Sequence, residues 1–429
     1  MKKLVIVGIP LLLLSLIIGS LGCAEEEEAE QAEARFAASP RSGSPPLEVQ
    51  FTDQSQGEIT DWEWDFDNDG TVDSTAQNPS NTYDTIGEYT VSLEVSGPGG
   101  ADTETKVNYI EVAYETEFTL RLTHITPPES PLGLIAQEFA DLVEEYTDGR
   151  VEVEVYPSGI LYSAGTQWEA TVTGAVDLVL MSSYFALGEL PYLSILYLLG
   201  MYEDYEHADL VTRSPELNAR VAADLEAKGI HHLGMPNYTF LSAYVNTVKE
   251  ITVRKDMAGL RLGLRTGSSI LHTDDYAEVV IVEVAPAELL TSLSTGVIDI
   301  YTVNPSVAVS EMVWEYGAEH AWIGAGGCMN MMLSMNLDSW NDLPADIQDI
   351  ITDEVMPEIM DLSYQLMVDE EDSAIETLSQ HLQSVNFETV EDRATMWEWA
   401  QDHPVVIGMK TVAGSELVQL IEDLRPSLG

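Results

Sequence analysis

Five basic residues fall close together in a chain that has few of them: Lys249, Arg254, Lys255, Arg261 and Arg265. The sequence holds 73 Asp and Glu but only 18 Lys and Arg, so a local excess of positive charge marks a candidate site for a small anion. Arginine suits a carboxylate because its planar guanidinium donates two parallel hydrogen bonds. For the first three residues we favour the alternative, pairing with neighbouring carboxylates. Arg261 and Arg265 are therefore the candidate carboxylate-binding residues.

A second group of candidate functional residues is acidic and could bind a metal ion. Asp65, Asp67, Asp69 and Asp73 have the spacing of a calcium-binding loop, which places hard oxygen ligands around one point. The bidentate acid expected later in such a loop is missing, because Ala76 stands there. The alternative is a turn whose aspartates accept hydrogen bonds from their own backbone. A Ca²⁺ ion bound by these aspartates is thus one of two hypotheses for this segment.

The overall charge limits the classes of partner. A formal net charge of −55 repels phosphate backbones, so no nucleic-acid partner is expected. The two cysteines, Cys23 and Cys328, lie in very different sequence contexts, which excludes a disulfide framework. Cys328 is expected to be a small core residue.

The N-terminus is typical of an exported lipoprotein. Two lysines precede an apolar stretch over residues 4–18, which predicts a signal peptide over residues 1–22. Cys23 follows a glycine and precedes four glutamates, which resembles the lipobox of secreted lipoproteins, although Ser20 stands where that pattern prefers leucine. The alternative is a signal peptide cut nearby, with an incidental cysteine. We predict a lipid anchor at Cys23, a solvated acidic tether over residues 23–33 and a location on the membrane surface in the cell envelope or periplasm.

Residues 34–114 are predicted to form a β-sandwich. Apolar and polar residues alternate over residues 47–52, 62–66 and 89–95, with turn-forming residues between these stretches and no helical period. This segment resembles a PKD domain, and the resemblance implies an Ig-like spacer or adhesion module without chemistry of its own. The stretches that carry it are Trp62 to Gly70, Asn81 to Tyr83 and Gly87 to Val91.

Residues 115–429 are predicted to form a large α/β unit. A strand is expected over residues 118–123, followed by a helix that Ser130 and Pro131 begin and that continues to about Tyr146. Further strands and helices then alternate, which predicts a parallel, doubly wound sheet with ligands beyond the carboxyl ends of its strands. A helical pattern over residues 343–382 is too long for one small lobe. It is expected to link two lobes.

The same unit resembles the solute-binding proteins of TRAP transporters, of the dicarboxylate-binding type. Five stretches carry the resemblance in the order that the family has them: residues 147–159, 174–178, 256–261, 296–299 and 340–344. The resemblance implies two α/β lobes of the periplasmic-binding-protein type, joined by a hinge. It also implies that the lobes close on a small organic acid and deliver it to a separate TRAP-type membrane permease, without catalysis.

The resemblance points to an arginine that this chain lacks. The family's ligand arginine ends the sequence Gly-Leu-Lys-Ile-Arg, and the corresponding residue here is Gly263. Arg261, Gly263 and Arg265 have the same parity, so they share one face if the segment is a strand. We expect Arg265 to reach the cleft where Gly263 leaves room, with Arg261 assisting. The alternative is a cleft without a guanidinium group, which would hold a less charged solute.

Other candidate ligand residues offer hydroxyl, amide or aromatic groups at the ends of predicted elements, where they can orient a solute. They are Ser182, Ser183 and Tyr184 after a buried strand, Gln167 and Trp168 at the start of the preceding helix, Asn304 where the family often has a ligand-facing asparagine, and Asn237, Tyr238 and Phe240 toward the second lobe. An ordinary packing or capping role is the alternative for each. His124 is expected to be a structural histidine.

Two other classes of function compete with solute capture. PKD modules also occur on secreted hydrolases, but the sequence has no His-Glu-x-x-His, no Gly-x-Ser-x-Gly and no clustered Cys and His ligands. The second competitor is a surface adhesin in which the PKD-like module binds a polymer. Binding of an organic acid, turnover of a substrate and retention on a polysaccharide distinguish the three classes.

Overall fold

The computed structural model describes residues 29–198, 200–265 and 274–425. The chain divides into two compact units, Met1–Ala113 and Tyr114–Gly429. The predicted signal peptide and the predicted lipidation site Cys23 lie outside the described residues.

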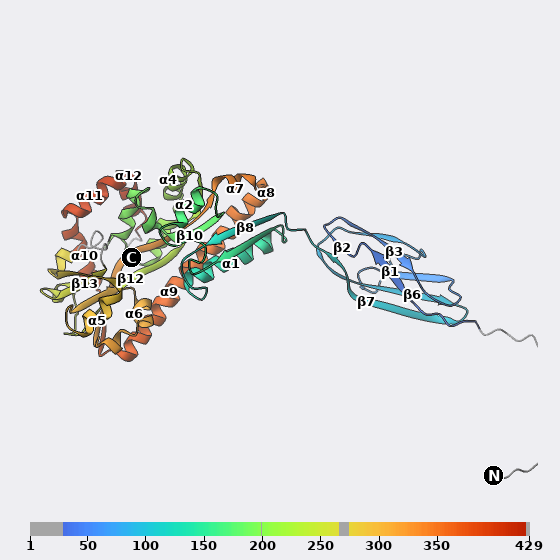
Figure 1. Ribbon diagram of the computed structural model, residues 1–429, viewed down its shortest axis with the longest axis horizontal. Helices are drawn as coiled ribbons and strands as arrows, with labels where there is room; N and C mark the ends of the chain where they lie inside the picture. The colour runs from blue at the N-terminus through green and yellow to red at the C-terminus, as the bar shows by residue number, and fades with distance from the viewer. Residues whose placement is uncertain (1–28, 199, 266–273, 426–429) are drawn as a thin grey trace, which may run out of the picture. The chain divides into compact units, whose positions relative to one another are not determined.

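The first unit is a sandwich of two β-sheets (Figure 1). One sheet has the strand order β1-β3-β5 and the other the order β2-β7-β6-β4. All pairs are antiparallel except the short pair β2 and β7. The strands are β1 (Phe36–Ser39), β2 (Ser42–Gly43), β3 (Leu47–Asp53), β4 (Asp61–Asp65), β5 (Ser80–Tyr83), β6 (Gly87–Gly97) and β7 (Gly100–Val112).

Aromatic side chains fill the space between these two sheets. The ring centroids of Phe51 and Trp64 lie 5.4 Å apart, and Phe36 meets Trp64 edge-on at 5.2 Å. All three side chains are buried, and edge-to-face contacts of this kind favour aromatic pairs beyond the area that they bury. These residues belong to the alternating pattern, so the predicted β-sandwich is confirmed.

The predicted tether is wrong at its C-terminal end. Glu33 exchanges two backbone hydrogen bonds with Gln56, and Ala32 and Ala34 are buried in the core of the sandwich. Small side chains at alternate positions fit beneath the sheet while the glutamate between them faces solvent. The ordered β-unit therefore begins before residue 34.

The second unit is built on one mixed sheet, in which the described residues form ten strands. The order is β14-β13-β15-β12-β16-β10-β8-β9, and β11 and β17 also pair with β16. The strands are β8 (Phe118–Thr123), β9 (Val151–Tyr156), β10 (Leu178–Ser182), β11 (Ile230–Gly234), β12 (Asn237–Asn246), β13 (Arg261–Arg265), β14 (Val280–Val284), β15 (Ile300–Val303), β16 (His320–Asn336) and β17 (Ser384–Phe387).

Helices cover this sheet, as Figure 1 shows. They are α1 (Pro131–Tyr146), α2 (Gln167–Val172), α3 (Tyr205–Arg213), α4 (Pro215–Glu226), α5 (Leu289–Ser294), α6 (Pro305–Ser310), α7 (Leu337–Asp342), α8 (Ala345–Asp349), α9 (Met356–His381), α10 (Val390–Ala400), α11 (Pro404–Ala413) and α12 (Ser415–Asp423).

The first lobe contains the parallel strands β9, β8 and β10, in that order. Helix α1 follows β8 and begins as predicted: the Ser130 side chain accepts a hydrogen bond from the backbone N–H of Gly133 at 3.1 Å, and Pro131 occupies the first turn. Ile135 and Phe139 on α1 are buried against the sheet. The predicted strand–helix–strand order is confirmed here.

The second lobe repeats this arrangement. Strand β13 lies between β14 and β15 and is parallel to both. Leu289 and Leu293 on α5 pack with Ile298 in the core of this lobe. Each lobe therefore has three parallel strands whose carboxyl ends lie at one edge.

The middle of the sheet differs from the prediction. Strand β16 is antiparallel to β10 and β12, and β12 is antiparallel to β15, so the purely parallel sheet that we predicted is wrong here. The reason is that β12 and β16 run from one lobe to the other. A strand that returns directly beside its partner is antiparallel, whereas a parallel neighbour needs a crossover helix. The two-lobed α/β architecture itself is confirmed.

The long helical pattern is also confirmed. Helix α8, a π-helical segment over Ile350–Val355 and α9 follow one another without a gap, and α9 packs on α1 in the first lobe and on α6 in the second (Figure 1). The predicted helix therefore links the two lobes.

One buried carboxylate of α9 holds the backbone where β12 crosses between the lobes. The pairing of β12 with β16 shifts register on both sides of Thr239. There the Glu371 carboxylate accepts hydrogen bonds from the Thr239 hydroxyl and from the backbone N–H groups of Phe240 and Leu241. The Tyr205 hydroxyl donates a further bond at 2.8 Å. Burial raises the pKa of Glu371, because water no longer solvates its charge.

Candidate functional site

A cavity of about 240 Å³ lies at the carboxyl ends of β8 and β10, next to the strands that cross between the lobes. The position agrees with the expectation that ligands sit beyond the carboxyl ends of strands. The residues that line it are His124, Ile125, Thr126, Leu132, Leu180, Met181, Ser182, Tyr184, Phe185, Tyr238, Met329 and Met331. Of the predicted site residues in this set, Tyr184 and Tyr238 come from β-strand ends that are far apart in the sequence.

His124 is the most unusual polar residue of the cavity wall. Its side chain is buried, with 1% of the residue exposed, and Nδ1 lies 3.0 Å from the Thr126 hydroxyl. The other ring nitrogen, Nε2, has no hydrogen-bond partner among the described residues. Burial lowers the pKa of His124, so the imidazole is neutral near neutral pH. The expected structural role accounts for Nδ1 but leaves Nε2 available to a ligand.

The two candidate serines after β10 differ in their surroundings. Ser182 lines the cavity, whereas Ser183 is fully buried and does not. The Ser183 hydroxyl lies 2.5 Å from the Tyr197 hydroxyl and also bonds to the side chain of Asn330. The geometry therefore weighs against Ser183 as a ligand residue and gives it a packing role in the turn Ser183–Ala186.

The two candidates on α2 lie beneath the surface. Gln167 is fully buried, and neither atom of its side-chain amide has a partner among the described residues. Trp168 is half-buried and packs against the hydrophobic core that contains Val179 of β10 and Met396 of α10. Neither residue lines the cavity. Their predicted contact with ligand stays a prediction.

The candidates on β12 divide in the same way. Asn237 is buried and donates a hydrogen bond to Asp209 at 2.6 Å, and Phe240 is buried in the core, so both serve packing. Tyr238 lies between them in sequence and lines the cavity, in the part of β12 where the pairing with β16 shifts register. Burial raises the pKa of Tyr238, which keeps its hydroxyl protonated.

The basic cluster is largely neutralised by carboxylates. The Arg254 guanidinium is buried against the ring of Trp322, at 4.8 Å from the centroid, and pairs with the equally buried Glu388 at 2.9 Å. Lys255 pairs with Glu278 at 3.3 Å. Pairing was the favoured alternative for these two residues, although Arg254 is buried rather than on the surface.

Arg261 is also paired. Its backbone N–H and its guanidinium both bond to Asp299, with Nη2 to Oδ1 at 2.6 Å and Nε to Oδ2 at 2.9 Å. This bond lowers the pKa of Asp299 and keeps it charged. Arg261 also stands at the start of β13, whereas a ligand would lie at the strand's carboxyl end. The structure therefore weighs against its predicted contact with ligand.

Arg265 stands at the carboxyl end of the same strand. Its backbone pairs with Val284 of β14, but its side chain lies outside the described part of the structure. Its predicted role as a carboxylate ligand therefore stays a prediction. Asn304 occupies the corresponding end of β15, where it is half-buried and its side chain does not cap α6.

The glycine that replaces the family's arginine has a local explanation. A Cβ atom at Gly263 would lie 2.3 Å from Cδ1 of Ile298, so any side chain at this position would have to displace Ile298. Ile298 itself is fully buried. The space beside β13 is thus filled from the neighbouring segment of the same lobe.

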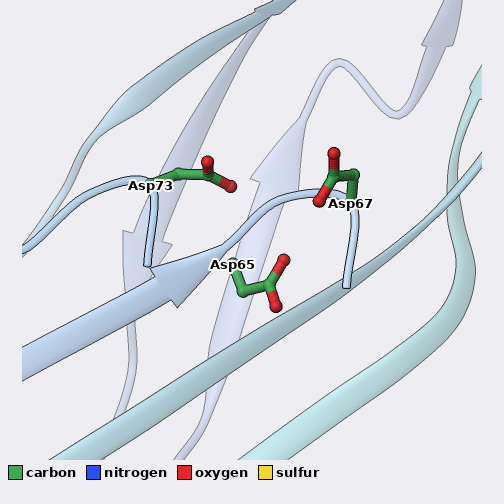
Figure 2. A group of neighbouring side chains, drawn as sticks. All are labelled: Asp65, Asp67 and Asp73. Carbon is green, nitrogen blue, oxygen red and sulfur yellow. The ribbon is translucent and has the colours of Figure 1, made fainter. Parts of the chain in front are cut away.

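The aspartates of the first unit satisfy both hypotheses in part. Asp65 accepts hydrogen bonds from the backbone N–H groups of Asp69 and Gly70, and Asp73 accepts one from Phe66, as in a self-bonded turn. Carboxylate oxygens of Asp65, Asp67 and Asp73 nevertheless lie within 4.8 Å of one another (Figure 2). Asp69 is not in this group. The predicted Ca²⁺ site stays a prediction.

Sequence reasoning missed the apolar part of the cavity wall. Phe185 follows a strand end, and Met329 and Met331 lie on β16 where it passes the cavity. The only available signal was a run of apolar residues directly after a buried strand, which usually indicates core. Within the described residues, no lysine or arginine lines the cavity.

Two lobes on one sheet, a helix that links them and a cavity at strand ends define the class of two-lobed solute-binding proteins. The chain belongs to the bacterial extracellular solute-binding protein family 7, whose model matches residues 122–403. A PKD domain model matches residues 27–112. Both predicted resemblances are confirmed.

Individual relatives agree with this assignment. The C4-dicarboxylate-binding periplasmic protein DctP of Rhodobacter capsulatus is 28% identical over 289 residues, which cover 65% of this chain and 83% of the relative. The fold of this chain is similar to that of a TRAP periplasmic solute-binding protein of Ochrobactrum anthropi (TM-score 0.66, 17% identity, 72% of this chain and 94% of that one). A succinate-bound one of Shewanella oneidensis gives a TM-score of 0.58, with 19% identity, over 72% of this chain and 99% of that one. These relatives are binding proteins and not enzymes.

The described helices differ in length and in how apolar they are. No single one of them is long and apolar enough to cross a bilayer, and only the bent pair α11 and α12, which meet at 99°, has the length and composition together.

Proposed function

We propose that this protein captures a small organic acid outside the cytoplasm and delivers it to a TRAP-type membrane permease. The observation that carries the proposal is the cavity at the carboxyl ends of β8 and β10, beside the strands that cross between the lobes. A solute bound there contacts the first lobe and the crossing strands at once. Contacts with both lobes favour the closed form, and the closed form docks on the permease.

The family supports an acid as the solute. The Rhodobacter relative is named for C4-dicarboxylates, and the Shewanella structure holds succinate. In this chain the proposed carboxylate ligand is Arg265 at the carboxyl end of β13. The parallel strands of the two lobes run in opposite directions along β16, so this end points toward the carboxyl ends of β8 and β10, where the cavity lies. Asn304 at the end of β15 and Tyr184 and Tyr238 on the cavity wall are proposed to orient the solute.

Titration calorimetry with a panel of soluble organic acids tests the function. At least one acid is expected to bind with measurable heat, whereas an adhesin or a hydrolase would bind or turn over a polymer instead. Arg265→Ala is expected to weaken the best acid by about 2–5 kcal/mol if the ion pair is desolvated. Lys249→Ala is the matched control, because Lys249 is an exposed cation from the same basic cluster. Equal affinities of the two variants would contradict the role of Arg265.

We further propose that the mature protein is anchored by a lipid on Cys23, after removal of residues 1–22. The four glutamates that follow Cys23 form a tether too polar to enter a membrane, and the PKD domain is proposed to act as a spacer. Mass spectrometry of the protein from membranes is expected to find a diacylglyceryl group on this cysteine. Cys23→Ser is expected to release the protein, while deletion of residues 34–114 is expected to leave the affinity for the acid unchanged.

A further inference from the structure

The cavity wall is mainly apolar, which restricts the kind of acid that fits there, given the proposed function. Seven of the residues that line it are apolar: Ile125, Leu132, Leu180, Met181, Phe185, Met329 and Met331. Methionine adapts its shape and makes favourable contacts with aromatic rings. A cavity of about 150 Å³ with walls of this kind holds benzene, so about 240 Å³ leaves room for a ring and a short acid side chain.

Exposed apolar residues gather at the same edge of the sheet. Ile125 follows β8, Ile160 and Leu161 follow β9, and Tyr184 and Phe185 follow β10, and all five are exposed. The segments that follow three adjacent parallel strands therefore carry apolar side chains that face solvent. Such a concentration of exposed apolar side chains is typical of a surface that an apolar ligand covers.

The polar groups of the wall are too few for a polyhydroxy acid. A sugar acid carries a hydroxyl on almost every carbon, and each one needs a partner when it leaves water. The Thr126 hydroxyl is already next to His124 Nδ1, and the Ser182 hydroxyl accepts from the backbone N–H of Tyr184. Among the described residues of the wall, what remains is His124 Nε2 and the hydroxyls of Tyr184 and Tyr238, which can serve one carbonyl or hydroxyl group beside the carboxylate that Arg265 is proposed to hold.

A dicarboxylate is also poorly served by this wall. Two carboxylates need two sets of positive or hydrogen-bond-donating groups, and no lysine or arginine with a described side chain lines the cavity. Arg261, the basic residue nearest in sequence to Arg265, is bonded to Asp299.

We infer that the solute is a monocarboxylate with an apolar body of about the size of an aromatic ring, which lies against the methionines and Phe185. The His124 Nε2 atom bonds to a polar oxygen of this solute. Succinate and D-erythronate, a small dicarboxylate and a small sugar acid, are the appropriate contrasts.

Titration calorimetry with 3-phenylpropionate, 4-methylpentanoate, succinate and D-erythronate tests this choice on the full-length protein. The two apolar monocarboxylates are expected to bind at least tenfold more tightly than succinate and D-erythronate. Tighter binding of succinate or D-erythronate would overturn the inference and leave the proposed function intact. Failure of every acid, including those of the wider panel, would instead contradict the proposed function.

A matched pair of variants tests the location. Phe185→Ser and Leu134→Ser replace two side chains that are each 45% exposed, of which only Phe185 lines the cavity. Phe185→Ser is expected to weaken 3-phenylpropionate at least fivefold, and Leu134→Ser is expected to change the affinity less than twofold. Equal effects of the two variants would overturn the assignment to this cavity.

His124 is tested with two substitutions, because a buried residue can be essential for folding. His124→Leu is expected to weaken 3-phenylpropionate about tenfold, and His124→Gln, which keeps a polar end, is expected to recover part of the loss. The melting temperature of each variant without ligand reports on folding. Full affinity in a folded His124→Leu protein would overturn the role of Nε2.

Discussion

The two lobes of the second unit share one local feature, a bond between an arginine of the central strand and an aspartate just before the neighbouring strand. In the first lobe, Arg121 of β8 bonds to Asp177 through its backbone N–H and its Nε atom, at 2.9 and 3.1 Å. In the second lobe, Arg261 of β13 bonds to Asp299 in the same way. The register is also the same, because Leu122 pairs with the residue after Asp177, just as Leu262 pairs with the residue after Asp299.

The lobes differ in what surrounds this arginine–aspartate bond. The second oxygen of Asp177 accepts a hydrogen bond from the Ser339 hydroxyl, whereas that of Asp299 accepts one from Arg261 itself. Toward the carboxyl ends of these strands, Ile125 follows Arg121 by the same number of residues as Arg265 follows Arg261. An apolar residue of the cavity wall in the first lobe, Ile125, thus corresponds to a basic residue in the second lobe, Arg265.

This comparison offers a structural role for Arg261 as an alternative to its predicted contact with ligand. Its spacing suggested a cleft residue, but the first lobe also has an arginine bonded to the aspartate of the same Gly-x-x-Asp motif, formed by Gly174 to Asp177 and by Gly296 to Asp299. A residue type repeated in both lobes is more consistent with a shared structural role than with a single ligand contact. The repeat was visible in the sequence.

The largest expected effect concerns an ion pair that the described first lobe lacks. Arg254→Met leaves the buried carboxylate of Glu388 without this cation and is expected to lower the free energy of unfolding by about 3–5 kcal/mol. Urea unfolding followed by the helical circular-dichroism signal measures it, because the described helices all lie in the second unit. Replacing both partners, Arg254→Met with Glu388→Leu, is expected to recover most of the loss. If the double variant recovered no stability, the unpaired charge of Glu388 would not be the cause of the loss.

The junction between the lobes gives the next effect. Glu371→Ala removes the acceptor of two backbone N–H groups and is expected to lower the free energy of unfolding by about 2–3 kcal/mol. The variant Glu371→Gln tests the raised pKa of Glu371 through the pH dependence of the free energy of unfolding. Because burial raises the folded pKa of Glu371, its contribution is greatest below its unfolded pKa of about 4.3 and is lost as the pH rises through the folded value. The stability of Glu371→Gln relative to the wild type should therefore increase with pH, and a constant difference would contradict the shift.

A third prediction concerns the packing beside the central strands. The first lobe has Thr123 and Val176 where the second has Gly263 and Ile298, so a larger residue in one segment is matched by a smaller one in the other. Gly263→Thr alone is expected to cost about 1–3 kcal/mol, because the new side chain collides with Ile298. Adding Ile298→Val is expected to recover part of this cost in the same urea assay. A double variant as unstable as Gly263→Thr alone would contradict the idea that these two positions compensate each other in both lobes.

The smallest effect belongs to the arginine–aspartate bonds themselves. Asp299→Asn is expected to cost about 1 kcal/mol, since Arg261 is 42% exposed and solvent screens the pair. Arg261 lowers the pKa of Asp299, so this stability is present above the ordinary carboxyl pKa and is lost as the pH falls through the lowered value. Asp177→Asn is the parallel measurement in the first lobe. A smaller loss there would agree with its single guanidinium contact.

Much of the fold could be predicted because short-range signals determine it. The cap at Ser130, the alternation in β8 and the long helical period of α9 were each readable locally. The antiparallel centre of the sheet was not, because nothing local in β16 says that its partners are β10 and β12. The site was predicted least well. Tyr184 and Tyr238, chosen from strand ends, line the cavity and stay predicted ligand residues, whereas the methionines of the wall look like core residues in sequence.

The length of β16 has a consequence for how this chain can vary. The strand extends over His320–Asn336, carrying the core residues Ala321 and Ile323 of the second lobe at one end and Met329 and Met331 of the cavity at the other. Successive side chains alternate between the two faces of a sheet, so inserting one residue between these parts would turn over every side chain on one side of the insertion. Natural variants of this protein are therefore expected to tolerate substitutions in β16 far better than single-residue insertions or deletions.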